Sequence, residues 1–299
     1  MLEQHSKKDI EKISIEILRG SNSLDVFPTP IDQIVSYSEL VVRNDIDVSK
    51  IHTDYLFKAN DALRRALTKV RGLLDRREKT IYLDLSQQKN KKAFVKLHEV
   101  GHHALPWQRN VHDILDDDDN SLSDNANENF EAEANFFASA TLFQQDRFVT
   151  ELNKHRLEIE SPMQLAKLFG ASVHATLRRY VECSKNSCAL FVLENVTAKG
   201  SQPKCFLRDK FQSEKFTKIF GDTNIPLELG YSWAFVQDYY HGRKFKKDGS
   251  ITLSTNNGEV DFVYHFFNNG YNAFVFLFPV GEKKSSRTKI IITGKNFQL

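Results

Sequence analysis

The sequence predicts an α+β protein in which a mainly helical N-terminal domain and a small helix-turn-helix unit precede an α+β C-terminal domain with an antiparallel sheet. Two observations support this fold class. Up to about residue 185, apolar side chains recur every three to four residues, which is the spacing of a buried helix face. From residue 186 onward, short runs rich in β-branched and aromatic residues alternate with Gly and Asn turns. We therefore expect three parts, residues 1–150, 151–185 and 186–299.

The composition is that of an ordinary globular protein, with 40% hydrophobic and 27% charged residues among 299. The sequence has no apolar run near the roughly 20 residues of a membrane span. Its N-terminus lacks the apolar core of a secretory signal, so none is expected. Three scattered cysteines argue against a disulfide framework and favour a cytoplasmic location. A net charge of +2 neither requires nor excludes a nucleic-acid partner.

The first elements are predicted from periodicity and from the residues that end them. A helix at Lys8–Arg19 ends at Gly20. A longer helix is predicted at Ala59–Arg77, where four apolar residues form one stripe. A strand follows at Thr80–Leu85, where apolar and polar side chains alternate.

The stretch KKAFVKLHEVGHHALPW is predicted to form a helix with Asn90 as its N-cap and Pro106 at its end. His98 and His102 lie one turn apart, so two imidazoles can reach one ion. Glu99 lies about 100° further round the helix, close to a water on that ion. H-E-x-x-H is therefore the pattern of two zinc ligands and a general base.

A catalytic zinc commonly takes three protein ligands. A second amphipathic helix is predicted at Asn127–Gln144. Winding it at about 100° per residue places Glu131 on the flank of its buried face, whereas Glu128 and Glu133 are expected on a solvated face. Glu131 is therefore the better third ligand. Asn135, one turn on, is expected to orient that carboxylate.

Two stretches, TIYLDLSQQKNKKAFVKLHEVGHHALPWQ and FEAEANFFASATLFQ, resemble the ImmA/IrrE family of zinc metallopeptidases, and the resemblance extends from about residue 27 to about residue 182. It implies a zincin-like peptidase domain with one Zn²⁺ bound by His98, His102 and Glu131. Glu99 is then the catalytic base. Related divalent ions fit the same ligands, so the resemblance does not fix the metal used in the cell.

The resemblance also implies a substrate and a role. In the family, the strand before the H-E-x-x-H helix borders the active-site cleft, so an extended substrate is expected to add to an edge formed by Tyr82, Leu83, Asp84 and Leu85. An ordinary core strand fits this stretch equally well. The family includes enzymes that cut helix-turn-helix repressors in bacteria, which implies a regulatory protease that acts in transcription regulation or a stress response.

Other polar clusters are expected to have ordinary roles. The four aspartates at residues 116–119 lack the spacing of a calcium-binding loop, so a solvated loop is expected. His103 is directed away from the ion and is expected at the surface. The donor that stabilises the oxyanion is not identified, and Tyr82, His103 and His112 are the candidates.

The stretch ESPMQLAKLFGASVHATLRRYVEC predicts two short helices joined at Gly170, which is a helix-turn-helix. The positions of its second helix expected to be exposed include His174, Thr176, Arg178 and Arg179. One arginine pair is a small electrostatic footprint for DNA. The unit is therefore expected to pack on the peptidase domain or to dock a protein.

The C-terminal part is predicted to contain strands at the runs CALFVLENV, KCFLRD, SITLST, EVDFVYHFF, NAFVFLFPV and TKIIITG. Asn-Gly turns at residues 255–259 and 268–272 indicate hairpins, and two helices are predicted between the second and third strands. The dense aromatic residues are expected to form the sheet core. Radiation-response members of the family carry a GAF-like sensor module at this end, but no motif here establishes one. A sensor or substrate-docking role is expected.

The leading hypothesis is an intracellular zinc-dependent endopeptidase that cleaves a protein such as a helix-turn-helix repressor. The alternative is a non-proteolytic regulatory protein that binds DNA or a protein and has a structural or vestigial metal site. A structural site would normally have a fourth ligand and no use for Glu99, so the first hypothesis is preferred. No membrane partner is expected.

Overall fold

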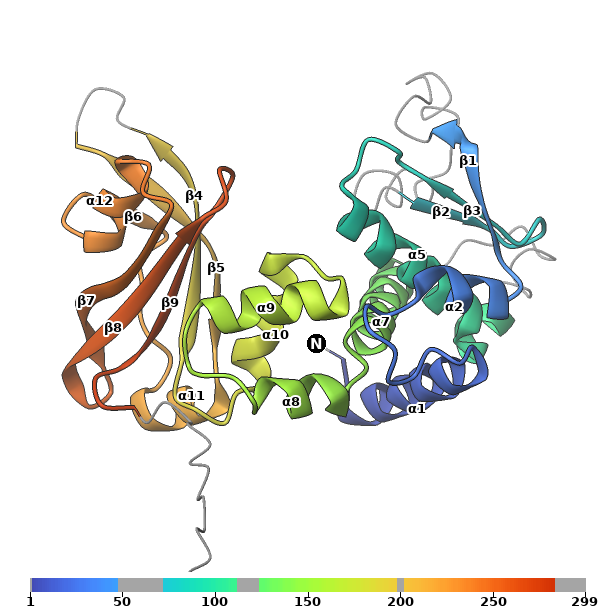
Figure 1. Cartoon of the computed structure of the whole chain (residues 1–299), viewed down its shortest axis with the longest axis horizontal. Coiled ribbons are helices and arrows are strands. Elements are labelled where there is room, and N and C mark those ends of the chain that lie inside the picture. The colour runs from blue at the N-terminus through green and yellow to red at the C-terminus, as the bar shows by residue number, and fades with distance from the viewer. Residues whose placement is uncertain (1, 48–71, 112–123, 198–201, 283–299) are drawn as a thin grey trace, which may run out of the picture. The chain divides into compact units, whose positions relative to one another are not determined.

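The computed structural model describes residues 2–47, 72–111, 124–197 and 202–282 (Figure 1). Its mixture of helices and sheets confirms the predicted α+β class. The chain divides into two compact units, Met1–Phe148 with Ala166–Ser172 and Val149–Leu165 with Val173–Leu299. This division falls close to the predicted boundary at residue 150. Residues 151–185, predicted to be a separate helix-turn-helix unit, are shared between the two compact units.

The first unit is mainly helical and contains one small sheet. Its helices are α1 (Gln4–Gly20), α2 (Ile31–Tyr37), α5 (Lys89–Ala104) and α7 (Asp124–Phe143), and residues 106–111 form a further helical turn. Its strands are β1 (Val41–Asp47), β2 (Gly72–Asp75) and β3 (Thr80–Leu83). Helix α8 (Asp146–Leu152) follows α7 and crosses the boundary between the units.

The small sheet has the strand order β1-β3-β2, so β3 is its central strand. Strand β1 runs parallel to β3, and β2 runs antiparallel to it. Tyr82 and Leu83 lie in β3 between these partners, and Asp84 and Leu85 follow its end. Tyr82 and Leu83 therefore do not form a sheet edge, because both sides of the strand are already paired there, and the alternative of a core strand fits them. For Asp84 and Leu85, which lie beyond β3, the edge role stays a prediction.

Two further expectations are corrected in this unit. The helix predicted at Ala59–Arg77 lies largely outside the described residues, but residues 72–75 form strand β2, because they pair with β3. Helix α5 begins at Lys89 with Gln88 as its N-cap, two positions earlier than the predicted N-cap Asn90. The side chain of Asn90 instead donates a hydrogen bond to the carbonyl of Ala171, at 2.9 Å.

Helices α5 and α7 approach each other closely at Gly101. A Cβ added at this glycine would lie 3.0 Å from Cδ1 of Phe137 and 3.3 Å from Cα of Ala134. Both α7 residues are completely buried, so little space is left for a side chain on α5. Glycine costs about 1 kcal/mol in a helix interior relative to alanine, and here it permits contact between the two backbones.

The second unit is built on a six-stranded antiparallel sheet of order β6-β5-β4-β9-β8-β7. Its strands are β4 (Ala189–Thr197), β5 (Lys204–Gln212), β6 (Glu228–Gly230), β7 (Phe245–Thr255), β8 (Gly258–Asn268) and β9 (Ala273–Pro279). Its helices include α10 (Val173–Cys183), α11 (Glu214–Phe220) and α12 (Ala234–Tyr240), while α9 (Glu160–Phe169) is shared with the first unit.

The strands and hairpins predicted for this unit are confirmed, apart from the run TKIIITG, which lies outside the described residues. Strand β6 was not predicted. Helices α11 and α12 bury Phe216 and Phe235 against strand residues such as Phe191. The aromatic residues thus form a packed core, as expected. Tyr180 of α10 packs edge-on against Phe276 of β9, at 5.8 Å between ring centroids.

Helix α10 is the second helix of the helix-turn-helix, and its side chains contact the sheet. Thr176 is fully buried, which corrects the expectation that it is exposed. The ring of His174 lies 5.5 Å from that of Phe274. The guanidinium of Arg178 lies over the ring of Phe211 and pairs with Glu182. Helix α10 therefore packs on the sheet of the second unit, whereas the sequence suggested packing on the peptidase domain or docking of a protein.

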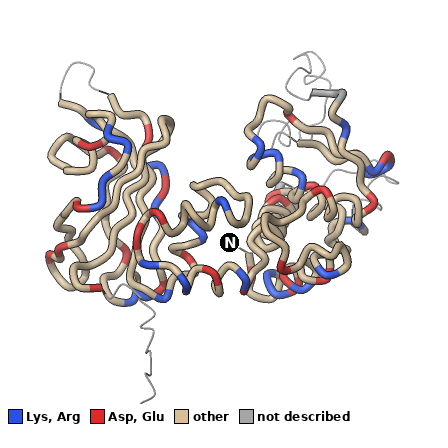
Figure 2. The backbone as a smooth tube through the Cα atoms, viewed as in Figure 1, with Lys and Arg blue, Asp and Glu red and all other residues tan. Residues whose placement is uncertain are grey.

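Lysine and arginine alternate with aspartate and glutamate along the described parts of both units (Figure 2). The described chain contains no helix that is long and apolar enough to cross a membrane. The aspartates at residues 116–119 and His112 lie outside the described residues.

We predict that Gly101→Val destabilises the protein by about 1–3 kcal/mol, because the added methyl groups overpack the α5–α7 contact. The same change should weaken zinc binding, since it separates the two helices. Urea unfolding and zinc titration measure the two effects. The control is Gly230→Val, because nothing lies within 4 Å of a Cβ at that position. A Gly101→Val variant with unchanged stability and zinc affinity would contradict this account of the packing.

Candidate metal centre

Three side chains from α5 and α7 converge on one point. Nε2 of His98 and Nε2 of His102 lie 3.0 Å apart. Oxygens of the Glu131 carboxylate lie 3.4 Å from each of these nitrogens. The structure thus brings together the three residues that the sequence suggested as ligands, and they form a group able to hold a metal ion.

The spacing of these three donor atoms fits a small divalent ion. Ligands at about 2.0–2.1 Å from a tetrahedral Zn²⁺ lie about 3.3–3.4 Å from one another, close to the separations found here. His98 is 1% exposed and the side chain of His102 is 13% exposed, whereas that of Glu131 is 39% exposed. The centre is therefore open to solvent on the side of Glu131, as a site that admits water and substrate must be.

The orientation of His102 is set by Gln108, which is completely buried. The Gln108 amide nitrogen donates to the Phe130 carbonyl, at 3.1 Å, and to the Glu133 carboxylate, at 2.7 Å. Both of these groups accept hydrogen bonds only, so the amide oxygen of Gln108 must face Nδ1 of His102, at 2.8 Å. Nδ1 of His102 is therefore the donor, and the lone pair of Nε2 is directed at the metal position.

The environment of Glu133 differs from the solvated helix face that the sequence predicted. Glu133 is 9% exposed, and one of its oxygens also accepts a hydrogen bond from Nε1 of Trp107, at 2.7 Å. Trp107 and Gln108 belong to the helical turn at residues 106–111, which covers this part of α7. Glu133 therefore holds Gln108 in place, and Gln108 in turn holds His102.

The carboxylate of Glu131 is ionised in this environment. Burial alone raises the pKa of Glu131, but the neighbouring imidazoles of His102 and His98 outweigh this effect and hold the pKa well below the usual range. Nδ1 of His98 is buried and has no hydrogen-bond partner among the described residues. A hydrogen bond thus fixes the tautomer of His102, whereas none among the described residues does so for His98.

Glu99 is only 5% exposed and lies next to the ligand His98 on α5. Burial raises the pKa of Glu99 to about 7, while the charge of His102 opposes the shift. Strand β2 covers this carboxylate: a Cβ added at Gly72 would lie 2.9 Å from Oε1 of Glu99 and 2.3 Å from Cγ1 of Val95. Glycine at the start of β2 is therefore required for this close packing.

The other residues that the sequence suggested for the site lie outside the group of three candidate ligands. Asn135 is exposed on α7 and has no hydrogen bond to Glu131 in the described structure, so its orienting role stays a prediction. His103 is partly buried, on a different side of α5 from His102, where it lines a separate cavity. Tyr82 is partly buried in the central strand β3.

A helix with H-E-x-x-H that packs against a second helix bearing a glutamate ligand is the arrangement of zinc peptidases with a His₂Glu site. Residues 57–180 match the family model described as the IrrE N-terminal-like domain, Peptidase_M78. The resemblance to the ImmA/IrrE family is thereby confirmed over this part of the chain.

A transcriptional regulator from Mycobacterium tuberculosis has a similar fold, with 12% sequence identity and a TM-score of 0.50, over 90% of this chain and 75% of that chain. At this identity the likeness concerns the fold alone. A comparison with curated proteins gives no match.

We predict that Gln108→Leu lowers zinc affinity by about 10–100-fold, the usual effect of losing a partner that orients a metal ligand. The change leaves Nδ1 of His102 without its acceptor. Competition with a chelator measures the affinity, and circular dichroism checks the fold. Gln202→Leu, at an exposed glutamine of the second unit, serves as the control. Equal zinc affinity in the two variants would show that Gln108 does not orient His102.

Proposed function

We propose that the chain is an intracellular zinc endopeptidase with a regulatory role, and that its substrate is a protein such as a helix-turn-helix repressor. The observation that carries this proposal is the convergence of His98, His102 and Glu131 beside the buried carboxylate of Glu99. The match to the IrrE N-terminal-like domain supports the same reaction class.

A zinc ion bound by His98, His102 and Glu131 would activate a water molecule and polarise the scissile carbonyl. In the proposed reaction, Glu99 accepts a proton from the attacking water and delivers it to the leaving nitrogen. Strand β2 packs on the Glu99 side chain at Gly72, and Glu99 is 5% exposed. Gln108 keeps the ring of His102 in its ligand orientation.

An extended substrate would need a sheet edge close to Glu99. Strand β2 is a better candidate than β3, because it lies at an edge of the sheet formed by the described strands and begins at Gly72, beside Glu99. We therefore assign to β2 the substrate pairing that the sequence suggested for Tyr82–Leu85.

The alternative function, reading of DNA by the helix-turn-helix, has less support. The second helix of such a motif must present its side chains to the major groove. In this chain His174 and Thr176 of α10 are occupied by contacts with protein. Docking of a protein partner or substrate on the second unit remains compatible with the proposal.

We predict that Glu99→Gln retains one zinc ion per chain and loses cleavage, because the amide keeps the shape of the side chain and cannot take the proton. A proteome-wide comparison of new peptide N-termini, in host cells that carry wild-type or variant chain with and without stress, measures cleavage and identifies the substrate. Glu128→Gln, at an exposed glutamate of α7, is the control. Cleavage by Glu99→Gln at the wild-type rate would refute the assignment.

A further inference from the structure

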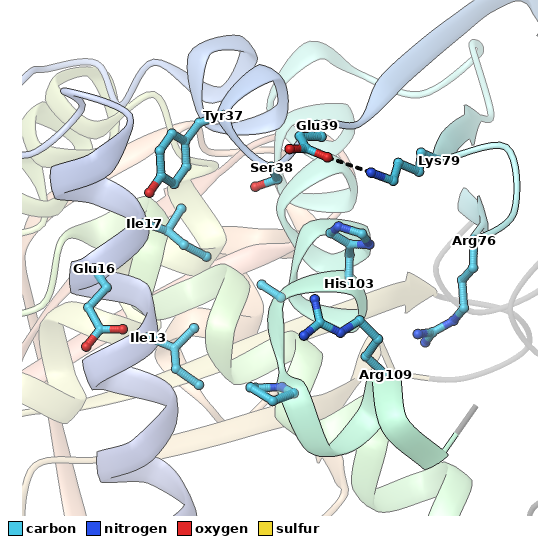
Figure 3. Close-up of a pocket in the computed structure, with 12 residues that line it drawn as sticks. Ile13, Glu16, Ile17, Tyr37, Ser38, Glu39, Arg76, Lys79, His103 and Arg109 are labelled. Carbon is cyan, nitrogen blue, oxygen red and sulfur yellow. Dashed lines mark hydrogen bonds and ion pairs between the residues drawn. The ribbon is translucent and has the colours of Figure 1, made fainter. Parts of the chain in front are cut away.

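The first unit contains a cavity that is separate from the metal centre and lies close to it. It has a volume of about 600 Å³ and is formed by α1, the end of α2, the turn between β2 and β3, and the end of α5 (Figure 3). Neither the three candidate metal ligands nor Glu99 line it. We propose that this cavity binds a small organic anion, whose carboxylate or phosphate contacts Arg76 and Arg109 and whose apolar body lies against α1.

One wall of the cavity is basic. Arg76, Lys79, His103 and Arg109 contribute side chains to it. Figure 3 shows the guanidinium of Arg109 beside the ring of His103, with Arg76 on the same side of the cavity. Lys79 is paired with Glu39, at 2.5 Å, so these two charges offset each other. The two guanidinium groups therefore determine the charge of this wall.

The two guanidinium groups come from different segments of the chain. Arg76 follows strand β2 and Arg109 lies in the helical turn after α5, and both line the cavity. Guanidinium groups bind carboxylate and phosphate through paired hydrogen bonds, which matches an anionic head group.

The opposite wall is formed by α1 and is apolar at Ile13 and Ile17. Glu16 adds one exposed carboxylate to this wall. A second anionic group at this end of a ligand would be repelled by Glu16, so the acid group belongs at the arginine end. The volume lies within the range of about 300–1,000 Å³ that is typical of small-molecule sites.

The cavity and the metal centre share structural elements. His103 follows the ligand His102 on α5, and Arg76 follows strand β2, whose first residue Gly72 packs on Glu99. An anion bound to Arg76 therefore contacts the turn that follows β2. The binding proposal itself does not depend on peptidase activity and is tested by binding alone.

The test is calorimetric titration of the full chain with five probes. Two probes, 4-phenylbutyrate and phenyl phosphate, combine an acid group with an apolar body. Acetate and inorganic phosphate have the acid group alone, and 4-phenylbutylamine has the apolar body with a positive charge. We expect 4-phenylbutyrate or phenyl phosphate to bind one site with a Kd below about 1 mM. The other three probes should bind at least tenfold more weakly.

Matched variants locate the site. Arg109→Gln should weaken binding about tenfold, as expected for the loss of hydrogen bonds to a charged group. Arg109 is exposed, so the variant should fold normally, and circular dichroism checks this. Arg77→Gln, one position beyond Arg76 and outside the cavity, should change the Kd less than twofold. Ile13→Ala should weaken binding of 4-phenylbutyrate and leave that of acetate unchanged.

Three results would overturn the proposal. The first is the absence of saturable binding by any anionic probe to the folded chain. The second is equal binding to wild type and Arg109→Gln, which would place the anion elsewhere, for example on a metal ion. The third is binding of 4-phenylbutylamine as tight as that of 4-phenylbutyrate, which would assign the cavity to cations through Glu16.

Discussion

The metal centre depends on how closely α5 and α7 approach each other. Two of the candidate ligands lie on α5 and the third on α7, so the 3.4 Å separations between the Glu131 carboxylate and the two imidazoles exist only while the helices stay in contact. Gly101, one residue before His102, allows this contact against Ala134 and Phe137. The glycine in HEVGH thus has a packing role that is separate from the chemistry of its neighbours.

Groups distant in sequence hold the reacting side chains in place. The helical turn after α5 supplies Gln108, which connects His102 to Glu133 on α7. The start of β2 supplies Gly72, which packs on Glu99. A shift of either segment would therefore change the geometry of the site without altering a ligand. The cavity is lined by Arg109 of the helical turn and by Arg76, the residue that follows β2, which gives a bound anion a physical connection to the site.

Local patterns predicted the parts of the site that lie on one face of a helix. The spacing of His98 and His102, and the position of Glu131 on the flank of its helix, follow from helix periodicity alone. The burial of Glu133 could not be predicted in this way, because it depends on Trp107 and Gln108, which reach it from another segment.

The small sheet shows the same limit of local patterns. Leu74 fits the predicted helical stripe, and only the pairing of residues 72–75 with β3 makes this segment a strand. The central place of β3 depends on β1, whose polar sequence VVRNDID carries little strand signal. In the second unit, by contrast, apolar runs bounded by Asn-Gly turns were sufficient to predict the hairpins, because register there is set locally.

The most direct test of the central claim is zinc K-edge X-ray absorption of the full chain loaded with one equivalent of zinc. The structure predicts a coordination shell of nitrogen and oxygen at about 2.0–2.2 Å with the scattering signature of two imidazoles. Substitution of His102 by alanine should remove one imidazole from this shell. A sulfur shell at about 2.3 Å, which would indicate binding by the free cysteines, or a shell without imidazole, would contradict the account.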